Sequence, residues 1–234
     1  MQTALRTSAR GLAVVLLATA AMAQAQDRFG DAPRAAEPAP AAARPAPGSA
    51  PAMADPGAGA LSGTPAGVQS GDALARLEAH ERQDHGVAPP AGLHTGPMHG
   101  ATPASLPGGR LVTTRELVAL LRGGAKGRPL VFDVLGGAEK LPGALMAVPA
   151  HQAGGFDDAV QQEFGRFLQQ VTQGRAERPL VFYCASTQCW MSYNAALRAV
   201  RLGYRQVLWY RGGIEAWKHA GQPLQAAGMA AAPR

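Results

Sequence analysis

Cysteine and aromatic residues are scarce in this sequence: only two of its 234 residues are cysteine, and 6% are aromatic. Cys184 and Cys189 lie too close together to staple a whole domain, which excludes a disulfide-rich scaffold and indicates local thiol chemistry. A Cys-x-x-Cys-His motif is absent, so no covalent haem is expected. His94 and His99 lie in a Pro/Gly-rich stretch without zinc-motif spacing, and we predict no metal site and no cofactor.

Long hydrophobic runs and clusters of basic residues are also missing. No apolar run after the N-terminal segment approaches the roughly 20 residues that cross a bilayer, so we expect no membrane span in the mature protein. The chain has 22 basic and 16 acidic residues, a net charge of +6, but no run of five Lys or Arg. This excess fits ordinary solubility, and we predict no nucleic-acid partner.

The first residues are typical of a cleaved secretory signal. Arg6 and Arg10 form a basic region, residues 11–18 open a short apolar stretch, and small residues at 21–25 suit a signal peptidase. We therefore predict that residues 1–25 are a signal peptide and that the protein is periplasmic or secreted.

The segments that flank the folded domain have a different composition. Residues 26–70 are rich in Ala, Pro and Gly, which predicts a disordered linker because few large apolar side chains are available for burial. Residues 71–109 are expected to form an extension, with a short helix over 71–86 and a Pro/Gly-rich loop that wraps the domain surface. Residues 225–234 are expected to be a flexible tail.

Alternating strand and helix patterns occupy residues 110–224. Thr113 and Glu116 fit a capping box that starts a helix. Short apolar runs typical of strands in a parallel sheet alternate with amphipathic stretches. The pattern predicts strands over residues 129–134, 145–148, 180–183 and 207–210, and helices that begin near residues 114, 157, 191 and 214. We therefore predict an α/β domain, a parallel sheet flanked by helices on both faces.

The most reactive position in this pattern is Cys184, which follows a strand and precedes a helix. Ligands bind at the carboxyl ends of parallel strands, and the N–H groups at a helix N-terminus stabilise a thiolate. Asp133 ends a neighbouring strand and is a supporting candidate, either for catalysis or for ordering its loop. The candidate active-site loop after Cys184 contains Ala185, Ser186, Thr187, Gln188, Cys189 and Trp190.

Several motifs resemble a rhodanese-like domain over about residues 110–224. They are Tyr-Cys-Ala-Ser-Thr-Gln-Cys at 183–189, Gly-Gly-Ile-Glu-Ala-Trp at 212–217, Gly-Gln-Pro at 221–223, the strand that ends at Asp133, and Leu-Pro-Gly-Ala at 141–144. The resemblance implies that Cys184 receives sulfane sulfur and passes it to a nucleophile. Residues 189–196 are similar to exported rhodanese-like proteins with a CxxCW motif, which are associated with alcohol oxidation dependent on pyrroloquinoline quinone.

The chain departs from the family pattern at four positions. A full CxxCW motif would place cysteine at Ser186, and the family often has glycine at Thr187, arginine at Cys189 and arginine at Leu135. Loss of the loop arginine implies weaker binding of an anionic donor such as thiosulfate, while a pair of thiols is gained. A disulfide requires the two Cα atoms within about 7 Å, which only a tightly curled loop allows.

Three functions remain open from the sequence. The first is a sulfurtransferase with a Cys184 persulfide, which would bind a small sulfur donor or thiol acceptor. The second is a thiol–disulfide accessory protein that uses Cys184 and Cys189 and has a periplasmic redox protein as its partner. The third is a non-catalytic rhodanese-like binding module, since fold alone does not fix function.

Overall fold

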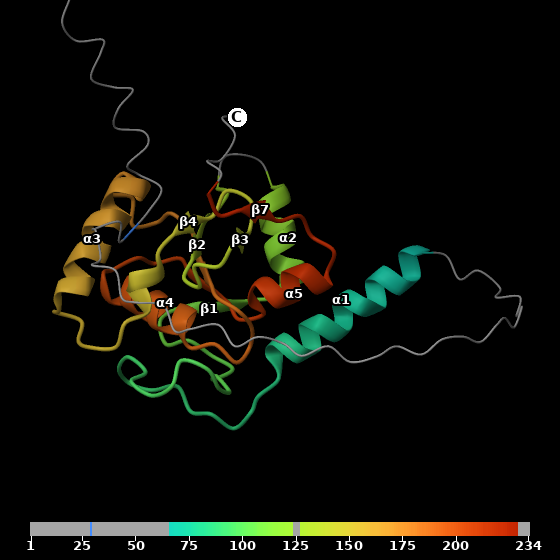
Figure 1. Cartoon of the computed structure of the whole chain (residues 1–234), viewed down its shortest axis with the longest axis horizontal. Coiled ribbons are helices and arrows are strands. Elements are labelled where there is room, and N and C mark those ends of the chain that lie inside the picture. Colours follow the sequence, from blue (N-terminus) through green and yellow to red (C-terminus); the bar gives the residue numbers. More distant parts are fainter. Residues whose placement is uncertain (1–28, 30–65, 124–126, 229–234) are drawn as a thin grey trace, which may run out of the picture.

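The main element of the domain is a sheet of five parallel strands (Figure 1). The computed structural model describes Phe29 and residues 66–123 and 127–228. In spatial order the strands are β1 (Arg110–Val112), β6 (Val207–Tyr210), β5 (Leu180–Tyr183), β2 (Leu130–Asp133) and β4 (Leu145–Met146). Every neighbouring pair in this sheet is parallel. The predicted α/β class and parallel sheet are therefore confirmed.

Helices cover both faces of the sheet, as predicted (Figure 1). The helices α3 (Ala159–Thr172) and α4 (Met191–Arg201) pack on one face, and α2 (Thr114–Arg122) and α5 (Gly213–His219) pack on the other. The capping box of α2 is present, with Thr113 accepting from the N–H of Glu116 and Glu116 accepting from the N–H of Thr113. Each hydrophobic core lies between one face of the sheet and the pair of helices that covers it.

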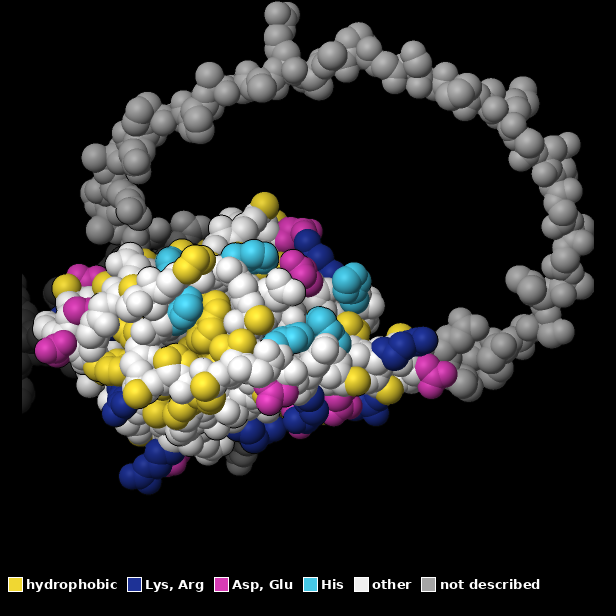
Figure 2. Space-filling view, turned by 90° about the horizontal axis from the view of Figure 1, so that it is seen from below, with side chains coloured by type: hydrophobic (Ala, Val, Ile, Leu, Met, Phe, Trp, Pro, Cys, Tyr) yellow, Lys and Arg dark blue, Asp and Glu magenta, His cyan; other side chains and the backbone are white. Residues whose placement is uncertain are grey.

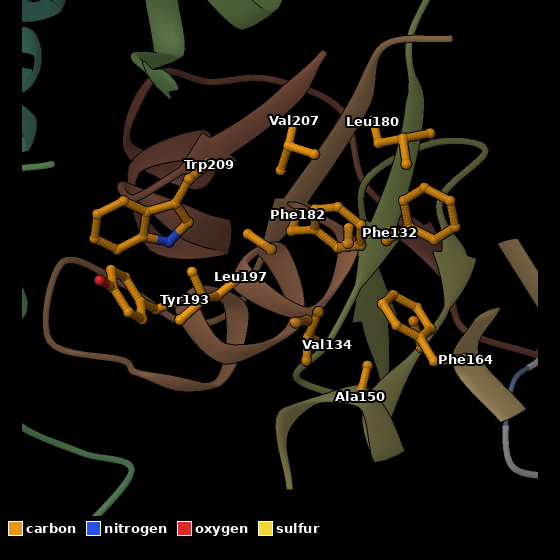
Figure 3. Close-up of a cluster of buried hydrophobic side chains, with 14 of the residues drawn as sticks. Phe132, Val134, Ala150, Phe164, Leu180, Phe182, Tyr193, Leu197, Val207 and Trp209 are labelled. Carbon is orange, nitrogen blue, oxygen red and sulfur yellow. The ribbon is translucent and has the colours of Figure 1, made fainter. Parts of the chain in front are cut away.

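The strands divide their side chains between the two cores because successive residues point to opposite faces. Phe182 and Trp209 face α3 and α4, while Tyr183 and Tyr210 face α2 and α5. Figure 3 shows the first core, in which Phe132 stacks on Phe182 with ring centroids 4.9 Å apart. Burial of each large apolar side chain stabilises the fold by roughly 1.5–3 kcal/mol.

Two predicted boundaries in the domain are wrong. The strand expected over 145–148 ends at Met146, and a short 3-10 helix (Val148–His151) follows, because Pro149 lacks an N–H and cannot join a ladder. The predicted tail begins too early, since β7 (Gln225–Ala226) pairs antiparallel with β3 (Glu139–Lys140) in a second sheet.

The extension before the domain starts with a longer helix than predicted. Helix α1 spans Ala66–Arg82, whereas the sequence predicted 71–86 and assigned 66–70 to the linker. Gly86 has a positive φ of 71° in the turn that follows. The predicted signal peptide and the linker residues 26–28 and 30–65 lie outside the described residues.

Phe29 belongs to the predicted linker but packs in the domain core. Its N–H donates to the Met146 carbonyl oxygen at 2.9 Å, and its ring contacts Phe164 and Phe167. The prediction of a disordered linker is therefore wrong at this residue, because an aromatic side chain finds an apolar site beside the edge strand β4. Within the described ranges, no helix has the length and hydropathy needed to cross a membrane.

Candidate functional site

Cys184 and Cys189 lie together at the carboxyl end of β5. Cys184 directly follows the strand, and the loop returns to place Cys189 just before α4. The two Cα atoms are 6.3 Å apart, and a disulfide joins the side chains. Both cysteines are buried, with exposed fractions of 1% and 5%. The loop is therefore tightly curled, which is the one of the two conformations left open by the sequence that allows the disulfide.

The N-terminus of α5 holds the backbone at the start of the loop. Ile214 N–H donates to the Cys184 carbonyl oxygen and Glu215 N–H donates to the Ala185 carbonyl oxygen, both at 3.0 Å. Gly213 has a φ of +63°, and a Cβ there would collide with the backbone of Ala185. Glycine is required at this position because the helix end and the loop approach so closely.

The sulfur of Cys184 is contacted by Ser192, in the first turn of α4. Ser192 Oγ lies 3.0 Å from Cys184 Sγ, and Ser192 N–H lies 3.4 Å from it. The indole N–H of Trp209 donates to Ser192 Oγ at 3.0 Å. Because an indole nitrogen only donates, the Ser192 hydroxyl proton is free to point at the sulfur. The helix therefore presents two donors to Cys184 Sγ.

A backbone carbonyl completes the surroundings of the sulfur. The Cys189 carbonyl oxygen lies 3.2 Å from Cys184 Sγ. A disulfide sulfur carries no proton, so this contact becomes a hydrogen bond only when the pair is reduced and Cys184 is a thiol.

Asp133 orders its own loop. It is fully buried at the end of β2, beside Tyr183, and its Oδ1 accepts from the N–H groups of Leu135 and Gly136 at 2.8 and 3.1 Å. Its Oδ2 has no hydrogen-bond partner among the described residues. These contacts order the turn that follows β2. Leu135, the position of the family's arginine, contributes its N–H to this turn.

Residues 94–102 of the extension, hereafter the strap, cover the loop. Trp190 N–H donates to the Met98 carbonyl oxygen at 2.9 Å, and Gly100 N–H donates to the Gln188 carbonyl oxygen at 2.8 Å. His99 and Cys189 form an isolated antiparallel bridge. The strap therefore adds a short piece of backbone pairing directly over the second cysteine.

Side chains fix both ends of the strap. His94 stacks on Trp190 with ring centroids 4.0 Å apart, and its N–H and carbonyl oxygen bond to the Asn194 side chain. At the other end, Thr102 Oγ1 donates to the Thr187 carbonyl oxygen at 2.7 Å. Figure 2 shows this face of the molecule, where histidine and hydrophobic side chains gather.

A buried guanidinium attaches the extension to the domain. Arg211, which follows β6, is 1% exposed and donates to the carbonyl oxygens of Glu81, Gln83 and Thr102 and to Thr102 Oγ1. Burial lowers the pKa of Arg211. Because Thr102 also bonds to Thr187, this anchor is connected to the active-site loop.

A second buried contact joins α1 to α2. The Glu81 carboxylate accepts from the N–H and hydroxyl of Thr114, and the Thr114 hydroxyl also contacts the Tyr210 hydroxyl at 2.7 Å. Burial raises the pKa of Glu81, and the hydrogen bonds from Thr114 oppose this shift.

Tyr193 lies in α4, where its ring contacts Trp190 and Trp209, and burial raises its pKa to about 12.

The structure brings most of the predicted loop residues around the disulfide and adds residues that sequence reasoning missed. Ser192, Trp209, Arg211 and the strap contacts were missed. The sequence feature that could have identified Ser192 is its position in the first turn of the helix that follows the strand-end cysteine. Among the described residues, no group of three or more His, Cys, Asp or Glu is placed to hold a metal ion.

A parallel α/β domain with a strand-end cysteine in a curled loop is thus defined by the fold and the site. Residues 115–220 match the family model of the rhodanese-like domain, and the predicted resemblance is confirmed over this segment. No curated protein matches the chain.

Two solved structures have partial likeness to the chain. A thiosulfate sulfurtransferase from Pseudomonas aeruginosa is 17% identical over 51% of this chain and 21% of its own, with a TM-score of 0.39. A Rhodopseudomonas palustris protein of unknown function, described as a possible tyrosine phosphatase, is 23% identical over 50% of this chain and 84% of its own, with a TM-score of 0.37. This chain therefore spans about a fifth of the sulfurtransferase.

Proposed function

We propose that this domain transfers sulfane sulfur through a persulfide on Cys184. The observation that carries the proposal is the pair of donors from Ser192 that faces Cys184 Sγ at the end of β5. Hydrogen bonds to an anionic sulfur favour the thiolate, which is the nucleophile in sulfur transfer. The match of residues 115–220 to the rhodanese-like domain supports the same chemistry.

The donor is expected to carry little negative charge. Cys189 stands where the family often has arginine, and the four hydrogen bonds of buried Arg211 all go to Glu81, Gln83 and Thr102. A divalent anion such as thiosulfate would therefore enter without a matched cation, whereas the persulfide of a small thiol needs none. The proposed partners are a small sulfane donor and a thiol acceptor.

The test is to load the reduced full chain with sulfur and to measure its intact mass. Cys189→Ser should gain one sulfur atom from a small-thiol persulfide, and more slowly from thiosulfate, because Cys184 is intact. Cys184→Ser is the matched control and should gain none. An equal gain in both variants, or none in either, would refute the Cys184 persulfide.

A second candidate function is thiol–disulfide exchange without sulfur transfer, which the Cys184–Cys189 disulfide favours. This function predicts that the pair equilibrates with a dithiol redox buffer in one two-electron step, and that Cys189→Ser takes up no sulfur. Sulfur uptake by that variant therefore separates the two functions.

We also propose that the protein acts after export, in the periplasm or outside the cell. The basic and apolar pattern of residues 1–25 supports this, and the resemblance of residues 189–196 supports a role beside quinone-dependent alcohol oxidation. Fractionation of cells that express the full chain, compared with a chain lacking residues 2–25, tests the location. Equal amounts in the cytoplasm would contradict export.

A further inference from the structure

We infer that Cys189 is the thiol that resolves the Cys184 persulfide: it attacks Cys184 Sγ, forms the disulfide and releases the outer sulfur as hydrosulfide. This inference rests on the proposed persulfide chemistry. It adds an activity, the reduction of sulfane sulfur to hydrosulfide. The two thiols of this chain supply the two electrons for this reduction.

The geometry places one nucleophile within reach of Cys184. The two sulfur atoms are bonded in this structure, so the loop already has the conformation that such an attack produces. Cys189 and Cys184 are the only cysteines in the sequence. An intramolecular thiol held in this position has a large advantage over a thiol in solution.

The strap also favours an internal nucleophile. Trp190 N–H donates to the Met98 carbonyl oxygen, Gly100 N–H donates to the Gln188 carbonyl oxygen, and Cys184 is 1% exposed. This coverage disfavours attack on a Cys184 persulfide by a thiol of a large protein.

The atoms and electrons of the reaction balance with thiosulfate as donor. The Cys184 thiolate attacks the outer sulfur, the S–S bond of thiosulfate breaks, and sulfite leaves. The Cys189 thiol then attacks Cys184 Sγ, and the persulfide S–S bond breaks with its electron pair on the outer sulfur. That sulfur takes the proton of Cys189 and leaves as hydrosulfide, so one sulfane sulfur is reduced and two thiols become a disulfide.

The surroundings of the disulfide indicate which sulfur a reductant attacks. Cys184 Sγ faces the donors of Ser192 and is the better stabilised leaving group. A dithiol reductant is therefore expected to attack Cys189 and to release Cys184 as a thiolate that is ready for the next donor.

The experiment is a single turnover of the reduced full chain with an excess of thiosulfate or inorganic polysulfide, without oxygen or added thiol, and with a long incubation because these anionic donors are expected to react slowly. The wild type should end as the disulfide, two hydrogens lighter, and should release one hydrosulfide per chain from thiosulfate. Cys189→Ser should stop at the persulfide and release none, and Cys184→Ser should do neither. Thermal unfolding of each reduced variant checks that it is folded.

The outcomes separate this inference from the proposed function. A persulfide that persists in both the wild type and Cys189→Ser would overturn the inference and leave the proposed function intact. The absence of a persulfide in Cys189→Ser with both donors would overturn both, whether or not the wild type becomes a disulfide.

Discussion

Ser192 contacts the reacting sulfur although it lies eight residues after Cys184. Its hydroxyl accepts the indole N–H of Trp209 and lies 3.0 Å from Cys184 Sγ, in a fully buried environment. In the proposed chemistry the Ser192 hydroxyl and backbone N–H would stabilise a thiolate, a persulfide anion or a departing thiolate at Cys184.

Replacement of this hydroxyl should raise the pKa of the Cys184 thiol. In a Cys189→Ser background, Ser192→Ala removes a hydrogen bond to a charged sulfur, and we expect a rise of about one pH unit. The measurement is the pH dependence of Cys184 alkylation. Ser186→Ala is the matched control, because Ser186 lies in the same loop and its hydroxyl contacts Gln188 N–H instead of the sulfur.

A purely structural role for Ser192 makes a different prediction. In that case Ser192→Ala would lower stability without a shift of the alkylation profile. The electrostatic role predicts instead that Ser192→Ala shifts the profile and that Ser192→Thr, which keeps the hydroxyl, retains the wild-type profile. An unchanged pKa in folded Ser192→Ala would contradict the electrostatic role.

At the scale of elements, an ion pair between a buried guanidinium and a partly exposed carboxylate joins α3 to α4. The Arg198 guanidinium is fully buried and binds both carboxylate oxygens of Asp158 at 2.9 and 2.8 Å. Asp158 also caps α3 through the N–H of Gln161. The hydrogen bonds from Arg198 hold the pKa of Asp158 below its ordinary value.

Asp158→Asn should destabilise the protein by about 2–3 kcal/mol at pH 7, because it leaves Arg198 buried without its counter-charge. The cap is retained, since asparagine also accepts from a helix N-terminus. A lowered pKa stabilises the fold above the ordinary pKa of Asp, and this contribution is lost as pH falls through the lowered value. The difference between variant and wild type in urea unfolding should therefore shrink in acid.

Glu177→Gln is the control for Asp158→Asn. It breaks the Arg205–Glu177 pair, whose side chains are 75% and 61% exposed, and should cost less than about 1 kcal/mol. If both variants lower the free energy of unfolding by the same amount at pH 7, the burial of Arg198 does not make its ion pair with Asp158 stronger than an exposed pair.

Elements with strong local signals could be predicted from the sequence. The capping box of Thr113 and Glu116 located α2, and the apolar run before Cys184 located β5. The pair β3 and β7 could not be predicted, because each strand has two residues and forms only through the pairing of residues 139–140 with residues 225–226 across the fold. The disulfide was open in the sequence because it depends on how tightly the loop curls.

The strap and its anchor were beyond sequence reasoning for a similar reason. His94 and Asn194 are 100 positions apart, and Arg211 bonds to residues 109 to 130 positions away. No local pattern marks such contacts. The sequence therefore predicted that the Pro/Gly-rich loop over residues 87–109 wraps the surface, but not that it covers the cysteines.

At the scale of the whole molecule, Arg211 connects three parts of the chain: the end of α1, the strap and the domain. Its planar guanidinium donates to four acceptors, of which the Glu81 carbonyl and both Thr102 oxygens are buried and the Gln83 carbonyl is partly buried. Because one side chain holds both the end of α1 and the strap, we expect these two segments to detach from the domain together.

Arg211→Met keeps the bulk of the side chain but leaves these four acceptors without their donor. We expect hydrogen exchange of residues 80–102 to rise, and alkylation of both cysteines in the reduced protein to accelerate at least severalfold, because buried acceptors without partners favour hydration of the extension. Arg205→Met is the control, since Arg205 is exposed and pairs only with Glu177 in the described contacts.

Unchanged exchange in folded Arg211→Met would mean that Leu93 and Leu106, both buried in the core, hold the extension without the guanidinium. Faster alkylation with unchanged exchange would place the barrier to the cysteines in the loop, and the strap would then not be the cover that keeps sulfur acceptors away from Cys184.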